Sequence, residues 1–201
     1  MNAILKTAAG NPENQDRGAV IVAGAKLVLV IADGAGGRSG GTEAAAMAVD
    51  LVCQNVSALN DPDSCADLIR KIDQAIAKDK AGGETTCVVV VVTVDGLFGA
   101  SVGDSGAWLI DDGGYVDLTR GQVRKPFAGS GSAFPTAFSH KQTNGLLLLA
   151  TDGLLKYSSP ERITAICRQA SPDEVTRQLI DLVRYPSGAL PDDVTVIFGE
   201  W

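Results

Sequence analysis

The sequence predicts an α+β fold with antiparallel β-sheets, and three observations indicate this class. Continuous apolar runs such as Leu27 to Ile31 and Leu146 to Ala150 predict strands. The first run is also rich in β-branched residues, which predicts a strand buried on both faces. Turn signals such as Gly24-Ala25 and Asp95-Gly96 predict hairpins, which join antiparallel strands. The helical patterns lie in two blocks and do not alternate with the strands, which disfavours a parallel sheet.

The first part of the chain predicts three strands followed by two helices. The strands are expected at Ile4 to Ala9, Gly18 to Ala23 and Leu27 to Ala32. The helices are expected from about Gly41 to Ser57 and from about Cys65 to Lys78. Between them, the polar residues Asn60 to Ser64 end the first helix and supply caps for the second.

The remainder predicts an antiparallel meander, an irregular segment and a second helical block. The meander strands are expected at Thr85 to Val94, Leu97 to Val102, Ala107 to Ile110 and Tyr115 to Leu118. The segment Thr119 to Thr143 is rich in Gly, Ser, Pro and basic residues and is interpreted as a surface loop. After the strand at Leu146, helices open at Ser158 to Glu161 and at Ser171 to Glu174, and Val194 to Phe198 forms the last strand.

Bulk composition limits the classes of function. A chain of 201 residues with a net charge of −7 and 45% hydrophobic residues is expected to be one acidic, globular domain. It has no basic stripe, so nucleic acid is not an expected partner. The four cysteines form no CxxC pair and are expected to be buried and reduced. No apolar run approaches the ~20 residues of a membrane span, and the N-terminus lacks a signal-peptide core, so a cytoplasmic protein without membrane contact is expected.

Aspartates stand at the ends of at least five apolar strands. Asp33, Asp104 and Asp152 follow such strands, while Asp16 and the pair Asp192-Asp193 precede them. One aspartate would be an ordinary turn residue, but five predict a shared acidic cluster. Carboxylates held within a few Å of each other cannot all stay ionised unaided. All the candidate ligands are oxygens, which predicts Mg²⁺ or Mn²⁺ at the cluster. Two such ions can hold and deprotonate a water for attack on phosphorus.

Rival interpretations of these residues are weaker. The only histidine, His140, falls in the expected loop and is interpreted as an ordinary loop residue, which excludes a histidine-rich zinc site. A dinucleotide fingerprint G-x-G-x-x-G would use Gly34 and Gly36, but its third position is Ser39. Asp33, directly before this turn, would also repel a pyrophosphate. The phosphate-loop pattern GxxxxGK[ST] is absent.

Six short motifs occur in a recognisable order along nearly the whole chain. They are Asn14-Gln15-Asp16, Asp33-Gly34-Ala35-Gly36-Gly37, Glu84-Thr85-Thr86, Gly103-Asp104-Ser105, Thr151-Asp152-Gly153 and Asp192-Asp193-Val194-Thr195. Together they resemble the patterns of the metal-dependent PPM, or protein phosphatase 2C, family in its bacterial form. Each motif is weak alone, but six in the family's order and in fitting strand contexts form a strong signal.

This resemblance implies a fold and a reaction. The fold would be a single four-layer α-β-β-α sandwich over residues 1–201, in which helix pairs flank two antiparallel sheets, with a shortened flap at about 119–143. The reaction would be the hydrolysis of phosphoserine and phosphothreonine by a hydroxide bound to Mg²⁺ or Mn²⁺, with two or three ions present. The implied partners are phosphoproteins in signal transduction and a cognate serine/threonine kinase.

The resemblance also implies the roles of particular residues. Asp33 would bridge two ions, with the Gly34 carbonyl on one of them. Asp152 and Asp192 would bind one ion, and Asp16 would help to hold the other through water. Asp104 with Asp152 matches a weaker third-ion site. Asp33 and Asp152 would therefore be the catalytic residues, acting through the metal-bound water.

Three positions depart from the family's pattern. The phosphate-binding arginine is replaced by Asn11, which loses a bidentate, charge-assisted contact. Arg17 or Arg38 would be the substitutes, although both have the pattern of ordinary surface arginines. Ala35 stands where animal members have a histidine, and the segment 119–143 is short for the family's flap. These departures leave two alternatives to a protein phosphatase: a non-catalytic signalling or binding module of the same fold, and a phosphatase for small phosphorylated molecules.

Overall fold

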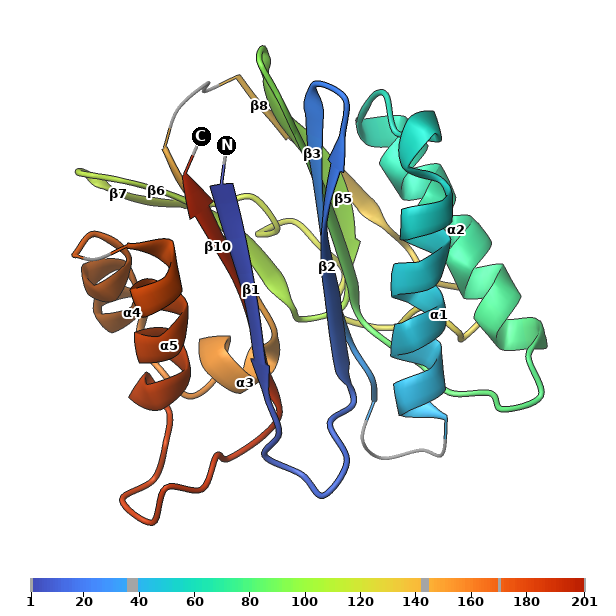
Figure 1. Cartoon of the computed structure of the whole chain (residues 1–201). Helices are drawn as coiled ribbons and strands as arrows, with labels where there is room; N and C mark the ends of the chain where they lie inside the picture. The colour runs from blue at the N-terminus through green and yellow to red at the C-terminus, as the bar shows by residue number, and fades with distance from the viewer. Residues whose placement is uncertain (1, 36–39, 142–144, 170, 201) are drawn as a thin grey trace.

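The computed structural model describes residues 2–35, 40–141, 145–169 and 171–200, and these form four layers in the order helices, sheet, sheet, helices (Figure 1). One five-stranded sheet consists of β1 (Asn2–Ala8), β10 (Val194–Glu200), β9 (Leu146–Ala150), β6 (Gly106–Asp111) and β7 (Gly114–Asp117), in that order. The other consists of β2 (Asp16–Ala23), β3 (Lys26–Asp33), β4 (Cys87–Thr93), β5 (Gly96–Val102) and β8 (Thr136–His140). All these strand pairings are antiparallel.

Helices cover the outer face of each sheet. Figure 1 shows α1 (Gly41–Gln54) and α2 (Pro62–Lys78) against the sheet that contains β2 and β3. It shows α4 (Pro160–Cys167) and α5 (Pro172–Leu182) against the sheet that contains β1 and β10. The short helix α3 (Asp152–Leu155) follows β9, and a 3-10 turn, η1 (Val56–Ala58), follows α1. The predicted α-β-β-α sandwich is therefore confirmed.

The strand β3 shows why its sequence is apolar at every position. Side chains alternate between the two faces of a strand. Leu29 and Ile31 pack between the two sheets, where they share a core with Leu149. Val28 and Val30 point to the opposite face and share a second core with α1 and α2. Both faces are buried, as the continuous apolar run, rich in β-branched residues, predicts.

The polar link between the first two helices contains a capping box. The Asp61 carboxylate accepts a hydrogen bond from the Ser64 N–H at 2.7 Å, and the Ser64 hydroxyl accepts one from the Asp61 N–H at 3.1 Å. With Pro62 at its first position, α2 begins three residues before the predicted start at Cys65. The predicted helix and its caps are confirmed, and the difference lies in the first turn.

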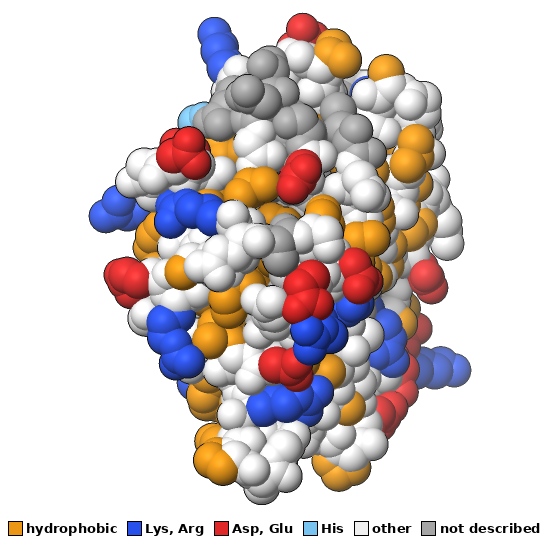
Figure 2. Space-filling model, turned by 60° about the vertical axis from the view of Figure 1, so that its left-hand side comes forward, with side chains coloured by type: hydrophobic (Ala, Val, Ile, Leu, Met, Phe, Trp, Pro, Cys, Tyr) orange, Lys and Arg blue, Asp and Glu red, His pale blue; other side chains and the backbone are white. Residues whose placement is uncertain are grey.

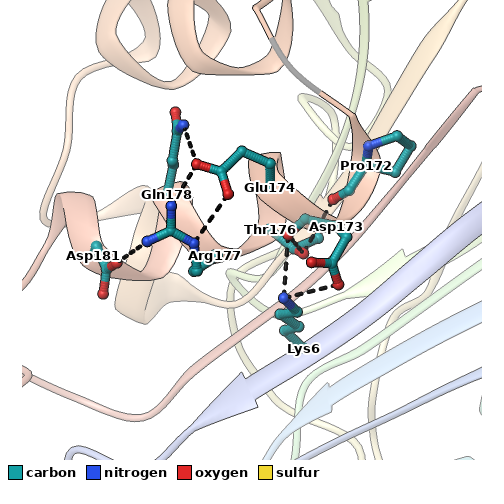
Figure 3. A network of polar contacts seen from close by, with 8 residues as sticks. All are labelled: Lys6, Pro172, Asp173, Glu174, Thr176, Arg177, Gln178 and Asp181. Atoms are coloured by element: carbon teal, nitrogen blue, oxygen red, sulfur yellow. Dashed lines mark hydrogen bonds and ion pairs between the residues drawn. The ribbon is translucent and has the colours of Figure 1, made fainter.

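The helix α5 is joined to β1 by a charged side chain. The Lys6 ammonium contacts the Asp173 carboxylate at 3.0 Å and donates to the Asp173 carbonyl oxygen at 3.2 Å (Figure 3). On the same helix, Arg177 forms ion pairs with Glu174 and Asp181 (Figure 3). These contacts are largely exposed, so each adds little to stability. The face carrying α4 and α5 mixes acidic and basic side chains and shows no expanse of one sign (Figure 2).

The segment predicted to be a surface loop contains a strand, so that prediction is wrong for Thr136–His140. This strand, β8, pairs with β5 at the edge of the sheet, from Leu97 opposite His140 to Ser101 opposite Thr136. His140 is therefore a strand residue. The sequence signal is weak because β8 is only five residues long and half-buried, with Phe138 as its one large apolar side chain.

The irregular part of the same segment is anchored to α2. Asp73, with 2% of its surface exposed, accepts hydrogen bonds from the backbone N–H groups of Gly129, Gly131 and Ala133 at 2.8, 2.9 and 3.2 Å. Ala128 also exchanges two backbone hydrogen bonds with Thr85, at 2.8 and 3.0 Å. A buried carboxylate that accepts several backbone N–H groups holds an irregular chain in one conformation.

All four cysteines are free thiols. Cys65, Cys87 and Cys167 are buried as predicted, but Cys53 is exposed, because it lies on the solvent face of α1. Among the residues that the structure describes, no helix is both long and apolar enough to cross a membrane.

Candidate active site

Aspartates from both sheets line one cavity. The cavity has a volume of about 280 Å³, and five of the six predicted metal-binding residues contribute to its wall: Asp33, Gly34, Asp104, Asp152 and Asp192. Asp33 ends β3 in one sheet, whereas Asp152 follows β9 and Asp192 precedes β10 in the other. The strand ends meet because the sheets pack face to face. The predicted shared acidic cluster is thus present in the fold.

Asp16, the sixth predicted residue, lies beside this cavity and not in its wall. It begins β2, directly opposite Asp33 in the strand pairing. The Thr151 hydroxyl donates to its Oδ2 at 2.8 Å. Its other oxygen, Oδ1, is buried and has no hydrogen-bond partner among the described residues. A buried carboxylate oxygen without a donor is costly, so Asp16 has an open ligand position.

The carboxylates disfavour each other's ionisation. Burial, reinforced by the charges of Asp16, Asp152, Asp192 and Asp104, raises the pKa of Asp33 to about 10. Burial likewise raises the pKa of Asp16 to about 7, and it raises that of Asp152. Such shifts indicate a site whose carboxylates are not neutralised by the protein alone.

The donor set fits a hard divalent cation. Asp33, Gly34, Asp152 and Asp192 line one cavity, and Asp16 adds an unsatisfied carboxylate oxygen beside it. In the described part of the chain, no three aspartate, glutamate, histidine or cysteine side chains are grouped closely enough to hold a metal ion as they stand. A bound Mg²⁺ or Mn²⁺ would keep several water ligands and would need few direct protein ligands. The assignment of individual ligands stays a prediction.

Two threonines fix the backbone that carries Asp33. The Thr86 hydroxyl accepts from the Asp33 N–H at 3.0 Å, and the Thr85 hydroxyl donates to the Asp33 carbonyl at 2.9 Å. Thr86 is also hydrogen-bonded to the Ser105 hydroxyl at 2.7 Å. Three of the sequence motifs therefore meet in one buried network, which sets the position of the Asp33 carboxylate.

Asp193 has a role that sequence reasoning did not assign. With 5% of its surface exposed, its Oδ1 accepts from the N–H groups of Gly10 and Asn11 at 2.8 and 3.0 Å, and its Oδ2 from that of Gln15 at 2.9 Å. It thereby folds the loop that forms one wall of the cavity. The only sequence signal was that two acids stand side by side, Asp192 and Asp193.

Asn11 contacts a predicted metal ligand. Its side-chain N–H donates to Asp192 Oδ1 at 3.1 Å, so it supports this carboxylate and brings no charge to the cavity. Arg17 does not line the cavity, and its guanidinium donates to the carbonyls of Asn14 and Asp16, both at 2.7 Å. Arg38, the other suggested substitute, lies outside the described residues, as do Gly36, Gly37 and Ser39.

The segment between β7 and β8 also contributes residues to the cavity wall. Arg124 forms an ion pair with Asp104, with its Nε and Nη2 each 2.9 Å from Oδ2. The carboxylate predicted to bind a third ion therefore has a protein partner. Lys125 and Phe127, which follow in the same segment, line the cavity.

One protein family matches most of this chain. A family model described as protein phosphatase 2C matches residues 7–184. The serine/threonine protein phosphatase PstP of Mycobacterium tuberculosis is 26% identical over 218 residues, which cover 90% of this chain and 41% of PstP. The chain thus spans less than half the length of the curated relatives it matches.

Solved structures share the fold along the whole chain. A bacterial serine phosphatase superposes with a TM-score of 0.87 at 22% identity, covering 100% of this chain and 97% of the other. The serine/threonine phosphatase Stp1 of Staphylococcus aureus has a TM-score of 0.80 at 21% identity, covering 98% and 93%. The family match, which spans most of the sequence, confirms the resemblance seen in the motifs: the chain belongs to the protein phosphatase 2C family.

Proposed function

We propose that this protein is a Mg²⁺- or Mn²⁺-dependent phosphatase that hydrolyses phosphoserine and phosphothreonine in proteins. The observation that carries the proposal is the cavity in which Asp33 from one sheet faces Asp152 and Asp192 from the other. A site that concentrates buried carboxylates is suited to binding divalent cations. When bound, two such ions would supply an activated water and would neutralise charge on the phosphoryl group.

The residues of the chain divide the remaining tasks. Asp33, Asp152, Asp192 and the Gly34 carbonyl would hold the ions, and the buried threonines beside Asp33 keep its carboxylate in place. A fixed ligand set favours catalysis because little reorganisation is needed during the reaction. Ala35 has no group that transfers a proton, so it cannot protonate the departing serine or threonine oxygen.

The decisive test is hydrolysis of a phosphothreonine peptide and of p-nitrophenyl phosphate with Mn²⁺, Mg²⁺ or EDTA. We expect turnover of the peptide that requires metal and is lost in EDTA. A folded protein that binds Mn²⁺ but hydrolyses neither substrate would contradict the proposal and identify a binding module. Preference for small phosphate esters over the peptide would instead indicate a small-molecule phosphatase.

The Asn11 position offers a graded test of substrate binding. Asn11→Arg is expected to lower the KM for the phosphopeptide by about threefold to tenfold, because a guanidinium adds a charge-assisted contact to phosphate. The side-chain contact with Asp192 is lost at the same time, so kcat should change little or fall slightly. Asn11→Gln, which adds length without charge, is the control. An unchanged KM in Asn11→Arg would mean that another cation already serves the phosphate.

A further inference from the structure

The described part of the candidate active site contains one basic side chain. Among the described residues that line the cavity, Lys125 alone is cationic, whereas Asp33, Asp104, Asp152 and Asp192 are acidic. A phosphorylated substrate brings negative charge into the same space. Since Asn11 contributes no charge there, any side-chain cation that complements the phosphoryl oxygens alongside the metal ions must come from another part of the chain.

The backbone on both sides of Lys125 is fixed to the core of the site. On one side, Gln122 donates to the Ser105 carbonyl at 2.7 Å and Arg124 forms its ion pair with Asp104. On the other side, Ala128 is paired with Thr85. The lysine therefore projects from a segment whose two ends are attached next to the acidic cluster, so its place at the cavity is built into the fold.

The Lys125 side chain is available to a ligand. Its ammonium lies 5.3 Å from the centre of the Phe127 ring, and the nearly buried Phe127 also lines the cavity. In the part of the chain that the structure describes, no carboxylate forms an ion pair with Lys125, whereas Arg124 is engaged with Asp104. The two neighbouring cations thus differ: Arg124 holds the segment, and Lys125 is left to face the cavity.

We propose that Lys125 binds the phosphoryl group of the substrate, in the place of the charged side chain that Asn11 does not provide. The inference rests on the proposed function and names its substrate-binding residue. An ammonium is a compact point charge that binds phosphate without bidentate geometry. Contact with the Phe127 ring keeps the ammonium near the cavity rim. The competing role is charge screening, in which Lys125 only lowers the repulsion among the carboxylates.

Enzyme kinetics and phosphate binding separate these two roles. The variants are Lys125→Ala and Lys125→Arg, with Lys80→Ala as the control, because Lys80 is an exposed lysine that lines no part of the cavity. We expect Lys125→Ala to raise the KM for a phosphothreonine peptide and the inhibition constant of inorganic phosphate together, by about tenfold, while kcat changes by less than about threefold. Lys125→Arg should restore most of both constants.

The double variant gives an independent check. If Asn11→Arg supplies the same contact, it should rescue Lys125→Ala, and its effect should be larger in that background than in the wild type. Unchanged phosphate inhibition in Lys125→Ala, together with tighter Mn²⁺ binding, would overturn the inference in favour of charge screening.

Calorimetric titration of the Mn²⁺-loaded protein with inorganic phosphate keeps this inference separate from the proposed function. A wild-type protein without turnover would overturn the proposed phosphatase activity. Weaker phosphate binding in Lys125→Ala than in the wild type would still support phosphate binding by Lys125. Turnover by the wild type, together with equal phosphate affinity in the wild type and Lys125→Ala, would overturn only the proposed role of Lys125. A Mn²⁺-loaded wild type that binds no phosphate would overturn it as well.

Discussion

Replacing Asp33 by asparagine is expected to abolish metal-dependent hydrolysis and to stabilise the metal-free protein. The loss of turnover should reach about 10²–10³-fold or more, because the variant removes the carboxylate that is predicted to bridge the two metal ions. The gain in stability has a separate cause. In the folded protein, burial and four neighbouring carboxylates raise the pKa of Asp33 from 3.8 to about 10, so its ionised form is disfavoured relative to the unfolded chain.

The sign of the pH dependence follows from that shift. Below pH 3.8 the carboxyl is protonated in both states and the substitution should change stability little. As the pH rises toward 10, the unfolded chain gains the free energy of ionisation and the metal-free folded protein does not. The gain in stability of metal-free Asp33→Asn over the metal-free wild type should therefore grow as the pH rises through neutrality. Each 1 kcal/mol moves the Tm of a protein of this size by about 2–4 °C, so a rise of several degrees is expected.

Thermal unfolding with EDTA and with Mn²⁺ measures both effects. Mn²⁺ should raise the Tm of the wild type, since a ligand that binds only the folded state stabilises it, and should have little effect on Asp33→Asn. Asp152→Asn should likewise raise the Tm in EDTA and weaken the response of the Tm to Mn²⁺. Asp95→Asn, in the turn between β4 and β5, is the matched control. Normal activity in either site variant, or an unaltered Mn²⁺ response, would refute the assigned ligands.

Asp193→Ala is expected to be among the most destabilising substitutions near the site. It leaves three backbone N–H groups, those of Gly10, Asn11 and Gln15, without their acceptor. An unsatisfied buried donor costs about 1–3 kcal/mol, and because these three groups are only partly buried and water can replace some of the contacts, the total loss should be about 1–3 kcal/mol. The loop would also lose its conformation, so activity should fall with stability. Asp193→Asn keeps one carbonyl oxygen and should retain much of both.

The adjacent aspartate provides the contrast. Asp192→Ala should weaken Mn²⁺ binding and turnover with little change in Tm, because among the described residues the Asp192 side chain accepts only from the Asn11 amide and the Asp193 N–H. Urea unfolding and Mn²⁺ titration of both variants would measure the difference. Equal loss of stability in Asp192→Ala and Asp193→Ala would contradict the separate roles.

The sequence predicts the layers of this fold because burial leaves a local signature. The strand from Leu27 to Ile31 is apolar throughout because each of its faces meets another layer. The recurrence of aspartates at strand ends also predicts their convergence, which the face-to-face packing of the two sheets brings about. β8 is not predictable by the same reasoning, because an edge strand buries too little to require an apolar pattern.

Other features depend on distant backbone and have no local pattern. Asp73 is one of several acids on α2, and only the folded chain brings the N–H groups of Gly129 and Gly131 to it. Asp193 serves N–H groups about 180 positions away in the sequence, and Lys125 reaches the site because its flanking residues attach to the turn at Asp104. Single sequences record which residues are buried more clearly than which groups they will meet.

The pairing of β1 with β10 has a consequence for how the protein folds. Asn2 lies opposite Glu200, so one sheet closes only when the two most distant parts of the chain meet. Contacts of such sequence separation form slowly. Because the acidic cavity needs strands from both sheets, neither half of the molecule can assemble it early. The recovery of Mn²⁺ binding during refolding should therefore coincide with the slowest structural phase.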